Sequence, residues 1–341
     1  MIDGVAAEKL RRVMEGRVRA HRDNKKTQID RASSHLEHIS HELFCKFQDL
    51  IYSETGIWLG THKTALLVGR LSRRLRSLHL SSMAEYFTLI SQPDQQQERM
   101  RMIDCITTNE THFFREPRHF EYLAHTVFPR WRQEVLAGVR TPHVRIWSAA
   151  CSTGEEPYSL AMMLLDHFGV DSGWKFEILA TDISSQVLEK ARNGIFPISR
   201  LKEIPSKYLR NYMLKGTGEQ HGRLRISPEV QNLVTFARVN LNADSFDVFQ
   251  PFDLILLRNV MIYFDQKAKR KVLAKIENRL SPGGYLFVGP SESLQALGIA
   301  LRPIIPSVYA KCEDGKKRDI LCGRSKHVSK SVLGAYGDPE R

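Results

Sequence analysis

The sequence lacks the features that define several large protein classes. Its five cysteines are odd in number and scattered without a CxxC pair, which argues against a disulfide framework and against a zinc site. No run of about 18 uncharged apolar residues occurs, so membrane insertion is not expected. Charged residues recur over residues 8–22, where a secretory signal would be apolar. We therefore expect a cytoplasmic protein.

Acidic residues are fewer than basic residues in this sequence. The chain has 50 Lys and Arg against 38 Asp and Glu, which gives a formal net charge of +12. A positive field favours acidic partners, and these include nucleic acid, anionic lipid and acidic protein surfaces. The charge alone does not choose among them.

The length of 341 residues predicts about two domains. Residues 1–36 are polar and basic and are expected to form a flexible extension. Apolar residues at helical spacing predict helices that begin near residue 37 and that cover 63–78 and 83–91, so residues 37–107 are expected to form an all-helical domain. Residues 312–341 are again basic and are expected to form a tail.

Strands alternate with helices from about residue 140. Predicted strands are VRIWSAA, FEILATDI, FDLILLRNVMIYF, YLFVG and VYAK, and predicted helices are EEPYSLAMMLLDHF, SSQVLEKARNG and QKAKRKVLAKIENRL. This alternation predicts a parallel, doubly wound, Rossmann-like α/β sheet over residues 108–311. LKGTGEQHGRLRI and LVTFARVNL resemble a hairpin with a Gly-rich turn, so a small β insertion is expected at about 200–236.

Polar residues follow each of the first two strands. The strand VRIWSAA runs into Cys151-Ser152-Thr153-Gly154-Glu155-Glu156, whose small side chains let a ligand approach the backbone. The two glutamates disfavour phosphate and suit a cationic ligand, such as the sulfonium and amino groups of S-adenosylmethionine, although they also suit helix capping. Asp182 ends the second strand, where an acid can accept hydrogen bonds from ribose hydroxyls or can cap the next helix.

Two further segments carry polar side chains. Arg258-Asn259-Val260-Met261-Ile262-Tyr263 follows the strand FDLILL, either as part of a ligand site at the carboxyl edge of the sheet or as a polar turn. The Asn/Asp-Pro-Pro-aromatic motif of amino DNA methyltransferases is missing there. The segment TTNETHFFRE, residues 107–116, precedes the α/β region and is either part of a site or a helix-capping linker.

Together, TNETHFFRE, WSAACSTGEEPYS, ATDIS with LEKARNGIF, and LLRNVMIYF resemble, in order and spacing, the CheR family of chemoreceptor glutamate O-methyltransferases. The resemblance covers about residues 37–311. It implies an S-adenosylmethionine-dependent methyltransferase domain without a metal. It also implies that glutamate side chains of chemoreceptor cytoplasmic domains become methyl esters, with S-adenosylhomocysteine as the second product.

The resemblance also implies roles for single residues. Cofactor contacts are expected from the methionine-side group Asn109, Thr111, Arg115 and Glu156 (in preference to Glu155), from Asp182 at the ribose, from Asn240 and Leu241 at the adenine, and from Arg258 and Asn259. Arg115 and Tyr263 are expected beside the transferring methyl group. Substrate contacts are expected from the arginines of the helix at 63–78, Arg70, Arg73, Arg74 and Arg76, although charges on a helix are often only solvated.

The β insertion resembles the loop of family members that bind a peptide at a receptor's C-terminus, although a plain glycine turn is the alternative. The expected partners are thus chemoreceptors, with recruitment to membrane receptor arrays, rather than nucleic acid. Two other functions remain open at this point, a nucleic-acid methyltransferase and a non-enzymatic protein that senses the cofactor.

Overall fold

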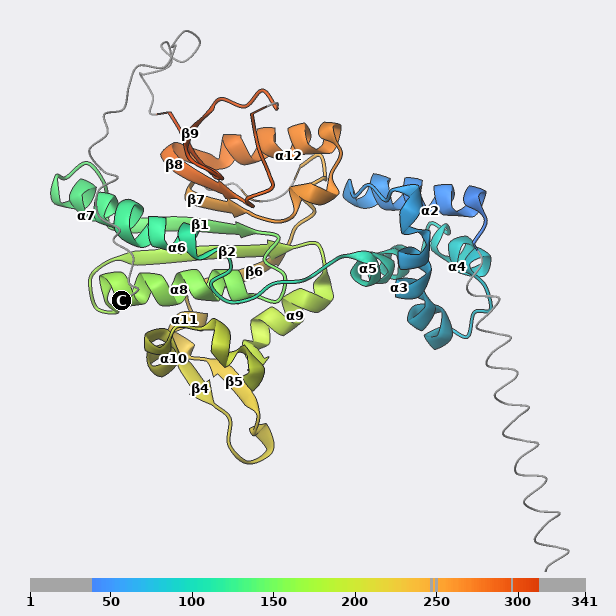
Figure 1. The fold of residues 1–341 in the computed structure, drawn as a ribbon, viewed down its shortest axis with the longest axis horizontal. Helices are drawn as coiled ribbons and strands as arrows, with labels where there is room; N and C mark the ends of the chain where they lie inside the picture. The colour runs from blue at the N-terminus through green and yellow to red at the C-terminus, as the bar shows by residue number, and fades with distance from the viewer. Residues whose placement is uncertain (1–38, 246–247, 249–250, 296, 313–341) are drawn as a thin grey trace, which may run out of the picture.

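The computed structural model describes residues 39–312, except 246–247, 249–250 and 296. The extension predicted for 1–36, and all but the first residue of the tail predicted for 312–341, lie outside the described residues. A helical domain comes first and an α/β domain follows it (Figure 1). Over the described ranges, no helix is both long enough and apolar enough to cross a membrane.

The helical domain contains α2 (His41–Thr55), the short η1 (Thr61–Lys63), α3 (Thr64–Ser77), α4 (Met83–Ile90) and α5 (Gln96–Ile106). The Ser40 side chain caps α2 by accepting the N–H of Leu43. Phe47 of α2, Leu71 of α3 and Met102 of α5 are fully buried in one shared core. The spacing of such apolar residues therefore builds the predicted helical domain.

The α/β domain is built on a seven-stranded sheet in the order β6-β2-β1-β7-β8-β10-β9. Its strands are β1 (His143–Ala149), β2 (Lys175–Asp182), β6 (Val234–Arg238), β7 (Phe252–Leu257), β8 (Leu280–Val288), β9 (Leu301–Ile305) and β10 (Val308–Lys311). The strands from β6 to β8 are parallel, whereas β10 is antiparallel to β8 and β9. The chain moves from β1 to β2 on one side and later to β7 on the other, and such a switch point is where α/β sheets bind ligands.

Helices lie on both faces of this sheet (Figure 1). One core contains α6 (Pro117–Tyr122), the π-helical turn η2 (Leu123–Val127), α7 (Phe128–Leu136) and α8 (Glu155–Phe168), and the opposite core contains α12 (Gln266–Arg279). Alternate residues of β1 reach the two cores, Ile146 the first and Trp147 the second, as the pleat of a strand requires. α9 (Ser185–Asn193) follows β2 and ends at Gly194, which has the left-handed φ of 60° expected of a helix stop.

A smaller antiparallel sheet, in the order β3-β5-β4, forms the β insertion. It comprises β3 (Ile195–Pro197), β4 (Met213–Lys215) and β5 (Arg223–Ile226), with η3 (Ile198–Glu203), α10 (Ser206–Tyr212) and η4 (Gly218–Gln220) between them, and α11 (Pro228–Gln231) follows. The predicted hairpin differs from this arrangement. β6, from LVTFARVNL, pairs in parallel with β2 in the main sheet, because the glycine turn already has both its strands in β4 and β5.

The strand predicted for FDLILLRNVMIYF is also shorter than expected. β7 ends at Leu257, and Met261–Tyr263 forms the 3₁₀ turn η5. Asn259 adopts a left-handed φ of 58°, which an extended strand cannot contain. This break turns the polar residues after β7 away from the sheet and toward the ligand edge.

Candidate active site

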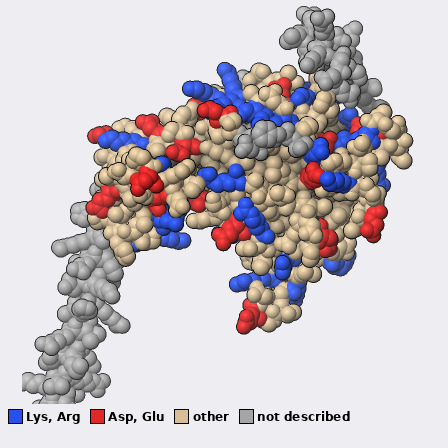
Figure 2. All heavy atoms as spheres, turned by 180° about the vertical axis from the view of Figure 1, so that it is seen from behind, with Lys and Arg blue, Asp and Glu red and all other residues tan. Residues whose placement is uncertain are grey.

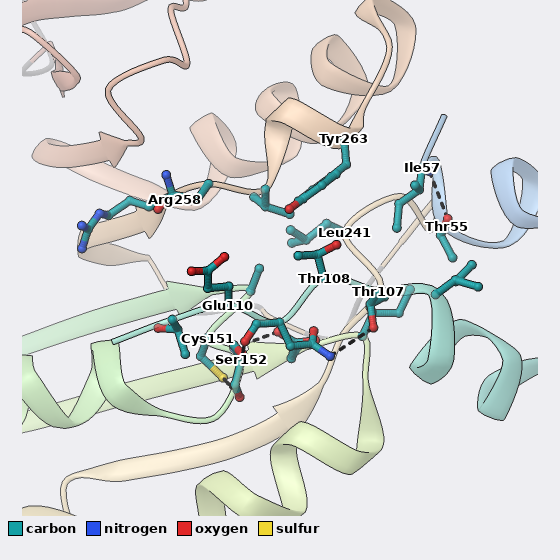
Figure 3. A pocket seen from close by; sticks show the side chains of 18 of the residues that line it. Thr55, Ile57, Thr107, Thr108, Glu110, Cys151, Ser152, Leu241, Arg258 and Tyr263 are labelled. Atoms are coloured by element: carbon teal, nitrogen blue, oxygen red, sulfur yellow. Dashed lines mark hydrogen bonds between the residues drawn. The ribbon is translucent and has the colours of Figure 1, made fainter. Parts of the chain in front are cut away.

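A pocket lies where the carboxyl ends of β1, β2 and β7 face the helical domain (Figure 3). It is lined by every residue predicted to contact the cofactor or the methyl group: Asn109, Thr111, Arg115, Glu156, Asp182, Asn240, Leu241, Arg258, Asn259 and Tyr263. Segments far apart in the sequence thus converge on one cavity. The sheet brings them together because its parallel strands end at the same edge.

Asp182 is buried at the end of β2. Its Oδ2 accepts the N–H of Ser152 at 2.9 Å and its Oδ1 accepts the N–H of Ser184, also at 2.9 Å. Burial raises the pKa of Asp182, while these backbone hydrogen bonds oppose that rise. Each carboxylate oxygen has a further lone pair, so a fixed acceptor pair lines the pocket.

The loop after β1 approaches the pocket with its backbone. Ala150 and Ser152 have left-handed φ values of 69° and 50°, and Gly154 has 95°. Ser152 also ties this loop to the segment before α6, because its hydroxyl donates to the carbonyl oxygen of Asn109 at 2.8 Å. Small side chains in an unusual backbone conformation leave room for a ligand against the chain.

The adjacent residues Glu155 and Glu156 point in different directions. Glu155 is 1% exposed, does not line the pocket, and accepts the hydroxyl of Thr153 at 2.6 Å. Glu156 lines the pocket, where its Oε1 accepts the hydroxyl of Ser148 at 2.6 Å and its Oε2 accepts Arg258 Nη1 at 3.0 Å. Burial raises the pKa of Glu156, and the Arg258 charge opposes the rise. The preference for Glu156 over Glu155 as the cofactor residue stays a prediction that this geometry favours.

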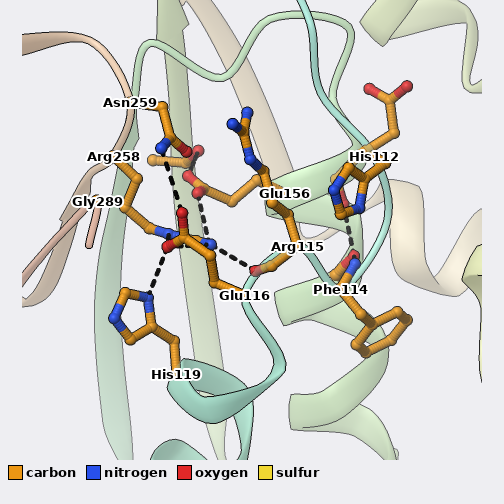
Figure 4. A network of polar contacts seen from close by, with 12 residues as sticks. His112, Phe114, Arg115, Glu116, His119, Glu156, Arg258, Asn259 and Gly289 are labelled. Atoms are coloured by element: carbon orange, nitrogen blue, oxygen red, sulfur yellow. Dashed lines mark hydrogen bonds and ion pairs between the residues drawn. The ribbon is translucent and has the colours of Figure 1, made fainter. Parts of the chain in front are cut away.

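Arg258 lies between two carboxylates (Figure 4). Besides Glu156, it contacts Oε2 of Glu116 through Nε at 3.2 Å and Nη2 at 2.9 Å, and Nη2 also donates to the carbonyl oxygen of Arg115. The Asn259 side chain donates to the second oxygen of Glu116 at 3.2 Å. Charge-assisted bonds of this kind hold a guanidinium in one orientation.

Asn109, Thr111 and Arg115 come from the segment between α5 and α6. Its two phenylalanines anchor it on the α/β domain: Phe113 contacts Phe196 of β3, and Phe114 stacks on Tyr208 of α10 with ring centroids 4.9 Å apart in each pair. The Arg115 side chain donates to the carbonyl oxygen of Glu110 at 3.0 Å. The aromatic residues of the motif therefore pack, while the polar ones line the cavity.

Asn240 and Tyr263 lie where the two domains meet. The Asn240 amide donates to the carbonyl oxygen of Glu54 at the end of α2 at 2.6 Å. The N–H of Trp58 donates to the carbonyl oxygen of Tyr263 at 2.9 Å, and the Tyr263 side chain points into the pocket (Figure 3). The helical domain therefore forms one wall of the cavity, with Thr55, Ile57, Leu59, Lys63 and Leu66.

The four arginines of α3 do not form one group. Arg70 lines the pocket and donates to the carbonyl oxygen of Ile106 and, at 2.9 Å, to the hydroxyl of Thr108. Arg74 turns into the helical core instead. Arg73 and Arg76 are exposed. The predicted substrate-binding role of the set stays a prediction, and the structure assigns its members three different surroundings.

Arg74 pairs with a carboxylate that is 5% exposed, that of Glu98 in α5. Its Nε lies 2.8 Å from Oε1 of Glu98, and the Tyr86 hydroxyl donates to the same oxygen at 3.0 Å. The Arg74 guanidinium and the Tyr86 hydroxyl lower the pKa of Glu98 against the opposing effect of its burial. Arg74 is therefore engaged in an ion pair within the helical domain.

Three contributions to the site were not predicted: the wall from the helical domain, Glu116, and Glu292 in the loop after β8. Glu116 is the last residue of TNETHFFRE, so its inclusion in a motif was a usable signal. Glu292 lies in GPSES directly after a buried strand, which is again the carboxyl edge of the sheet. The wall left no comparable signal, because it depends on how the two domains pack.

The pocket fits S-adenosylmethionine by the chemistry of its side chains. Asp182 offers two acceptor oxygens of the kind that ribose hydroxyls need, Leu241 and Ile183 offer apolar surface that suits a base, and Glu156 offers a carboxylate that suits an amino group. In the part of the chain that the structure describes, no group of three or more His, Cys, Asp or Glu side chains is arranged to hold a metal ion.

Known proteins agree with this description. The all-alpha domain of CheR methyltransferases matches residues 42–107, and the SAM-binding domain of the same family matches residues 109–304. A chemotaxis protein methyltransferase of Escherichia coli is 41% identical over 271 residues, covering 80% of this chain and 91% of that protein. Chemotaxis protein methyltransferase 2 of Pseudomonas aeruginosa is 39% identical over 274 residues, covering 80% and 94%.

Among solved structures, the glycopeptide N-methyltransferase MtfA in complex with S-adenosylmethionine is 19% identical, and the match covers 46% of this chain and 48% of that one. Its TM-score of 0.26 is too low for the likeness to bear on function. The fold, the pocket and the matched domains define the class, an S-adenosylmethionine-dependent methyltransferase. Within that class, the chain belongs to the CheR methyltransferase family.

Proposed function

We propose that this enzyme methylates glutamate side-chain carboxylates of chemoreceptors, giving glutamate methyl esters and S-adenosylhomocysteine. One observation carries the proposal: Tyr263 and Arg115 line the same cavity as Asp182 and Glu156. The groups suited to orient a carboxylate therefore face the groups suited to hold the methyl donor. The names of the family's relatives support chemoreceptors as the substrate.

When bound, S-adenosylmethionine supplies a methyl group on a positively charged sulfur. A substrate glutamate, with an ordinary pKa of about 4.3, is already ionised at neutral pH and needs no general base. Asp182 and Glu156 agree with this chemistry, because each accepts fixed hydrogen bonds instead of standing unpartnered. The enzyme's task is alignment, and orientation of this kind can supply roughly 7–11 kcal/mol.

Arg115 and Tyr263 would orient the incoming carboxylate. A tight ion pair with Arg115 would blunt the nucleophile, and the bond from its guanidinium to the carbonyl oxygen of Glu110 leaves the charge partly engaged. The Tyr263 hydroxyl would hold the second carboxylate oxygen. Asn109, Thr111, Arg258 and Asn259 would complete the contacts to the methionine part of the donor, and Asn240 and Leu241 would frame its adenine.

The receptor would approach across α3. Arg70 at the pocket and Arg73 lie three residues apart on one side of this helix, and Arg73 and Arg76 are exposed. Acidic and basic side chains are interspersed over the face of the enzyme seen in Figure 2. Nucleic acid binds best to a continuous positive surface, so this face favours a protein as the partner. We expect the enzyme to act in the cytoplasm, recruited to receptor arrays.

The β insertion would act as a second, tethering contact. β4 and β3 are the two outer strands of its three-stranded sheet, so an extended receptor tail could add to an open edge. A tether raises the local concentration of the substrate without changing the chemistry. Binding of a receptor C-terminal peptide to the full-length protein, and its loss when residues 215–222 are shortened to a two-residue turn, would support this contact, whereas equal binding by both proteins would contradict it.

The proposed function can be tested with methyl-labelled S-adenosylmethionine and a receptor cytoplasmic fragment. The expected result is label on the receptor that mild alkali releases as methanol, because methyl esters hydrolyse whereas methylated amines do not. Replacement of the target glutamates by glutamine should abolish it. Alkali-stable label, label on RNA or DNA only, or no turnover by a protein that binds the donor would each contradict the proposal.

A further inference from the structure

The loop after β7 carries Arg258, Asn259 and Tyr263, yet a residue outside the loop holds its backbone. Glu292, 6% exposed in the loop after β8, accepts the N–H of Asn259 at 2.8 Å through Oε2 and the N–H of Ile262 at 3.2 Å through Oε1. Its Oε2 also accepts the N–H of Gly289 at 2.6 Å. One buried carboxylate therefore connects the ends of two neighbouring strands.

Gly289 packs so closely against Glu292 and Asn259 that there is no room for a side chain at this position. A Cβ added to Gly289 would lie 2.7 Å from Oε2 of Glu292 and 2.8 Å from the Asn259 side-chain nitrogen. Asn259 itself has a left-handed φ of 58°, a conformation that needs support from its neighbours. The three groups thus pack against one another, and the carboxylate supplies the hydrogen bonds that hold the turn.

Two acids hold the start of the loop, and only one of them reaches its far end. Glu116 binds the side chains of Arg258 and Asn259, at the start of the loop. Glu292 alone among these acids reaches the N–H of Ile262, the residue before Tyr263. The carbonyl oxygen of Tyr263 is held from the other domain by Trp58. The placement of Tyr263 over the cavity therefore depends on Glu292 on one side and on the helical domain on the other.

We propose that Glu292 is a positioning residue for the reaction: by holding the N–H of Ile262, it sets the place of Tyr263 over the pocket without touching substrate or cofactor. The proposal rests on the methyl-transfer role given above to Tyr263. It separates Glu292 from Glu116, which holds the cofactor side of the same loop.

The variant Glu292→Gln tests this separation because its amide has only one acceptor oxygen. The arrangement that keeps most hydrogen bonds puts that oxygen in the place of Oε2, facing Asn259 and Gly289, and turns the NH₂ group against the N–H of Ile262. The variant should therefore release the Tyr263 end of the loop and keep the Asn259 end. A displacement of about 1 Å can cost about 100-fold in rate.

Three measurements are compared between Glu292→Gln and the unmodified protein: turnover with a receptor fragment, affinity for S-adenosylhomocysteine by calorimetry, and amide hydrogen exchange over residues 258–264. We expect kcat to fall at least about tenfold, the dissociation constant to change less than about threefold, and exchange at Ile262 to accelerate. Glu189→Gln, the same charge change at an exposed residue of α9, is the matched control and should leave all three unchanged.

Full turnover by Glu292→Gln would overturn the proposal, and so would a loss of affinity in proportion to the loss of rate, since that would make Glu292 a general structural residue. If the variant does not fold, the unmodified enzyme decides: an Ile262 amide that exchanges as fast as exposed loop amides would refute the contact. Tyr263→Phe keeps the outcomes distinguishable. Full activity of Tyr263→Phe would contradict the proposed role of the Tyr263 hydroxyl in methyl transfer. Accelerated exchange at Ile262 in Glu292→Gln would still establish the hydrogen bond between Glu292 and the N–H of Ile262.

Discussion

The carboxyl edge of the sheet and the arginine-bearing face of α3 behave differently. At the sheet edge, residues from five segments predicted separately meet in one cavity. On α3, four arginines within seven residues have three different surroundings, with Arg74 paired to Glu98, Arg70 at the pocket, and Arg73 and Arg76 exposed. Closeness in sequence therefore predicted shared surroundings less well than a position just after a strand did.

The difference has a physical cause. Parallel strands must end at a common edge, so the position of a residue just after a strand is determined by the backbone. A long arginine side chain on a helix instead finds whichever acceptor the neighbouring helices offer, and that acceptor can lie far away in sequence. Polar residues just after parallel strands therefore predict where a ligand site lies. Charged residues on a helix predict only that their side chains find partners, and do not predict which ones.

The largest effect is expected at the sheet edge. Asp182→Asn replaces one of two acceptor oxygens by a donor and removes the charge. Since hydrogen bonds to a charged group contribute about 1.5–3 kcal/mol each, affinity for S-adenosylhomocysteine should fall by about 100-fold. Calorimetry measures this, with Glu189→Gln as the control for the loss of one charge. An affinity within a few-fold of the unmodified protein would remove Asp182 from the cofactor site.

A pH effect should come from His119, beside the same site. Burial, and then the charge of Arg258, lowers the pKa of His119 from 6.5 to about 4. The unfolded chain therefore takes up a proton first, so stability present above pH 6.5 is lost as the pH falls toward 4, by up to about 3 kcal/mol.

Urea unfolding of His119→Gln and of the unmodified protein between pH 7 and pH 4 checks this contribution. The variant should lose less stability over that range, and His221→Gln, at an exposed residue, should lose as much as the unmodified protein. Parallel curves for all three proteins would show that His119 does not titrate as expected.

Single substitutions of the arginines on α3 should have different effects on the stability of the protein. Arg74→Ala leaves the buried Glu98 with the Tyr86 hydroxyl and with the exposed Arg101 guanidinium, 3.5 Å away. The free energy of unfolding should therefore fall by about 2 kcal/mol, less than for a fully buried pair, because Arg74 is partly exposed. Arg76→Ala should change it by less than about 0.5 kcal/mol. Denaturant titration distinguishes them, and equal effects would show that the pairing with Glu98 contributes nothing.

The smallest effect is expected from the exposed arginines. Arg73→Glu and Arg76→Glu should each raise the KM for a receptor fragment by about three- to tenfold and should leave affinity for S-adenosylhomocysteine unchanged, because surface charges act mainly on encounter with the partner. The rise should shrink at high salt. An unchanged KM would mean that the receptor does not approach across this part of α3.

Much of the fold followed from periodicity and stop signals. The helix predicted as EEPYSLAMMLLDHF has the bounds of α8, and Gly194 ends α9 as predicted. The polar segment of α5 gave too few apolar residues for a prediction, although Met102 and Ile103 are buried, because its helix is stabilised by packing on α3. β6 was assigned to the wrong sheet, since strand pairing depends on partners distant in sequence.

The site was predictable as far as its motifs reach. Those motifs name the residues that line the cavity, but they do not contain the contacts between the segments. The position of Glu292 just after a buried strand indicates the carboxyl edge of the sheet, but not the backbone groups that its carboxylate binds. The wall from the helical domain depends on domain packing and leaves no pattern in nearby residues.

The most direct test of this account is a crystal structure of the enzyme with S-adenosylhomocysteine. It should place both ribose hydroxyls within hydrogen-bond distance of Asp182, the amino group near Glu156, and the sulfur facing Tyr263. An adenosyl group bound elsewhere, or one whose sulfur faces away from Tyr263 and Arg115, would contradict the alignment on which the proposed methyl transfer depends.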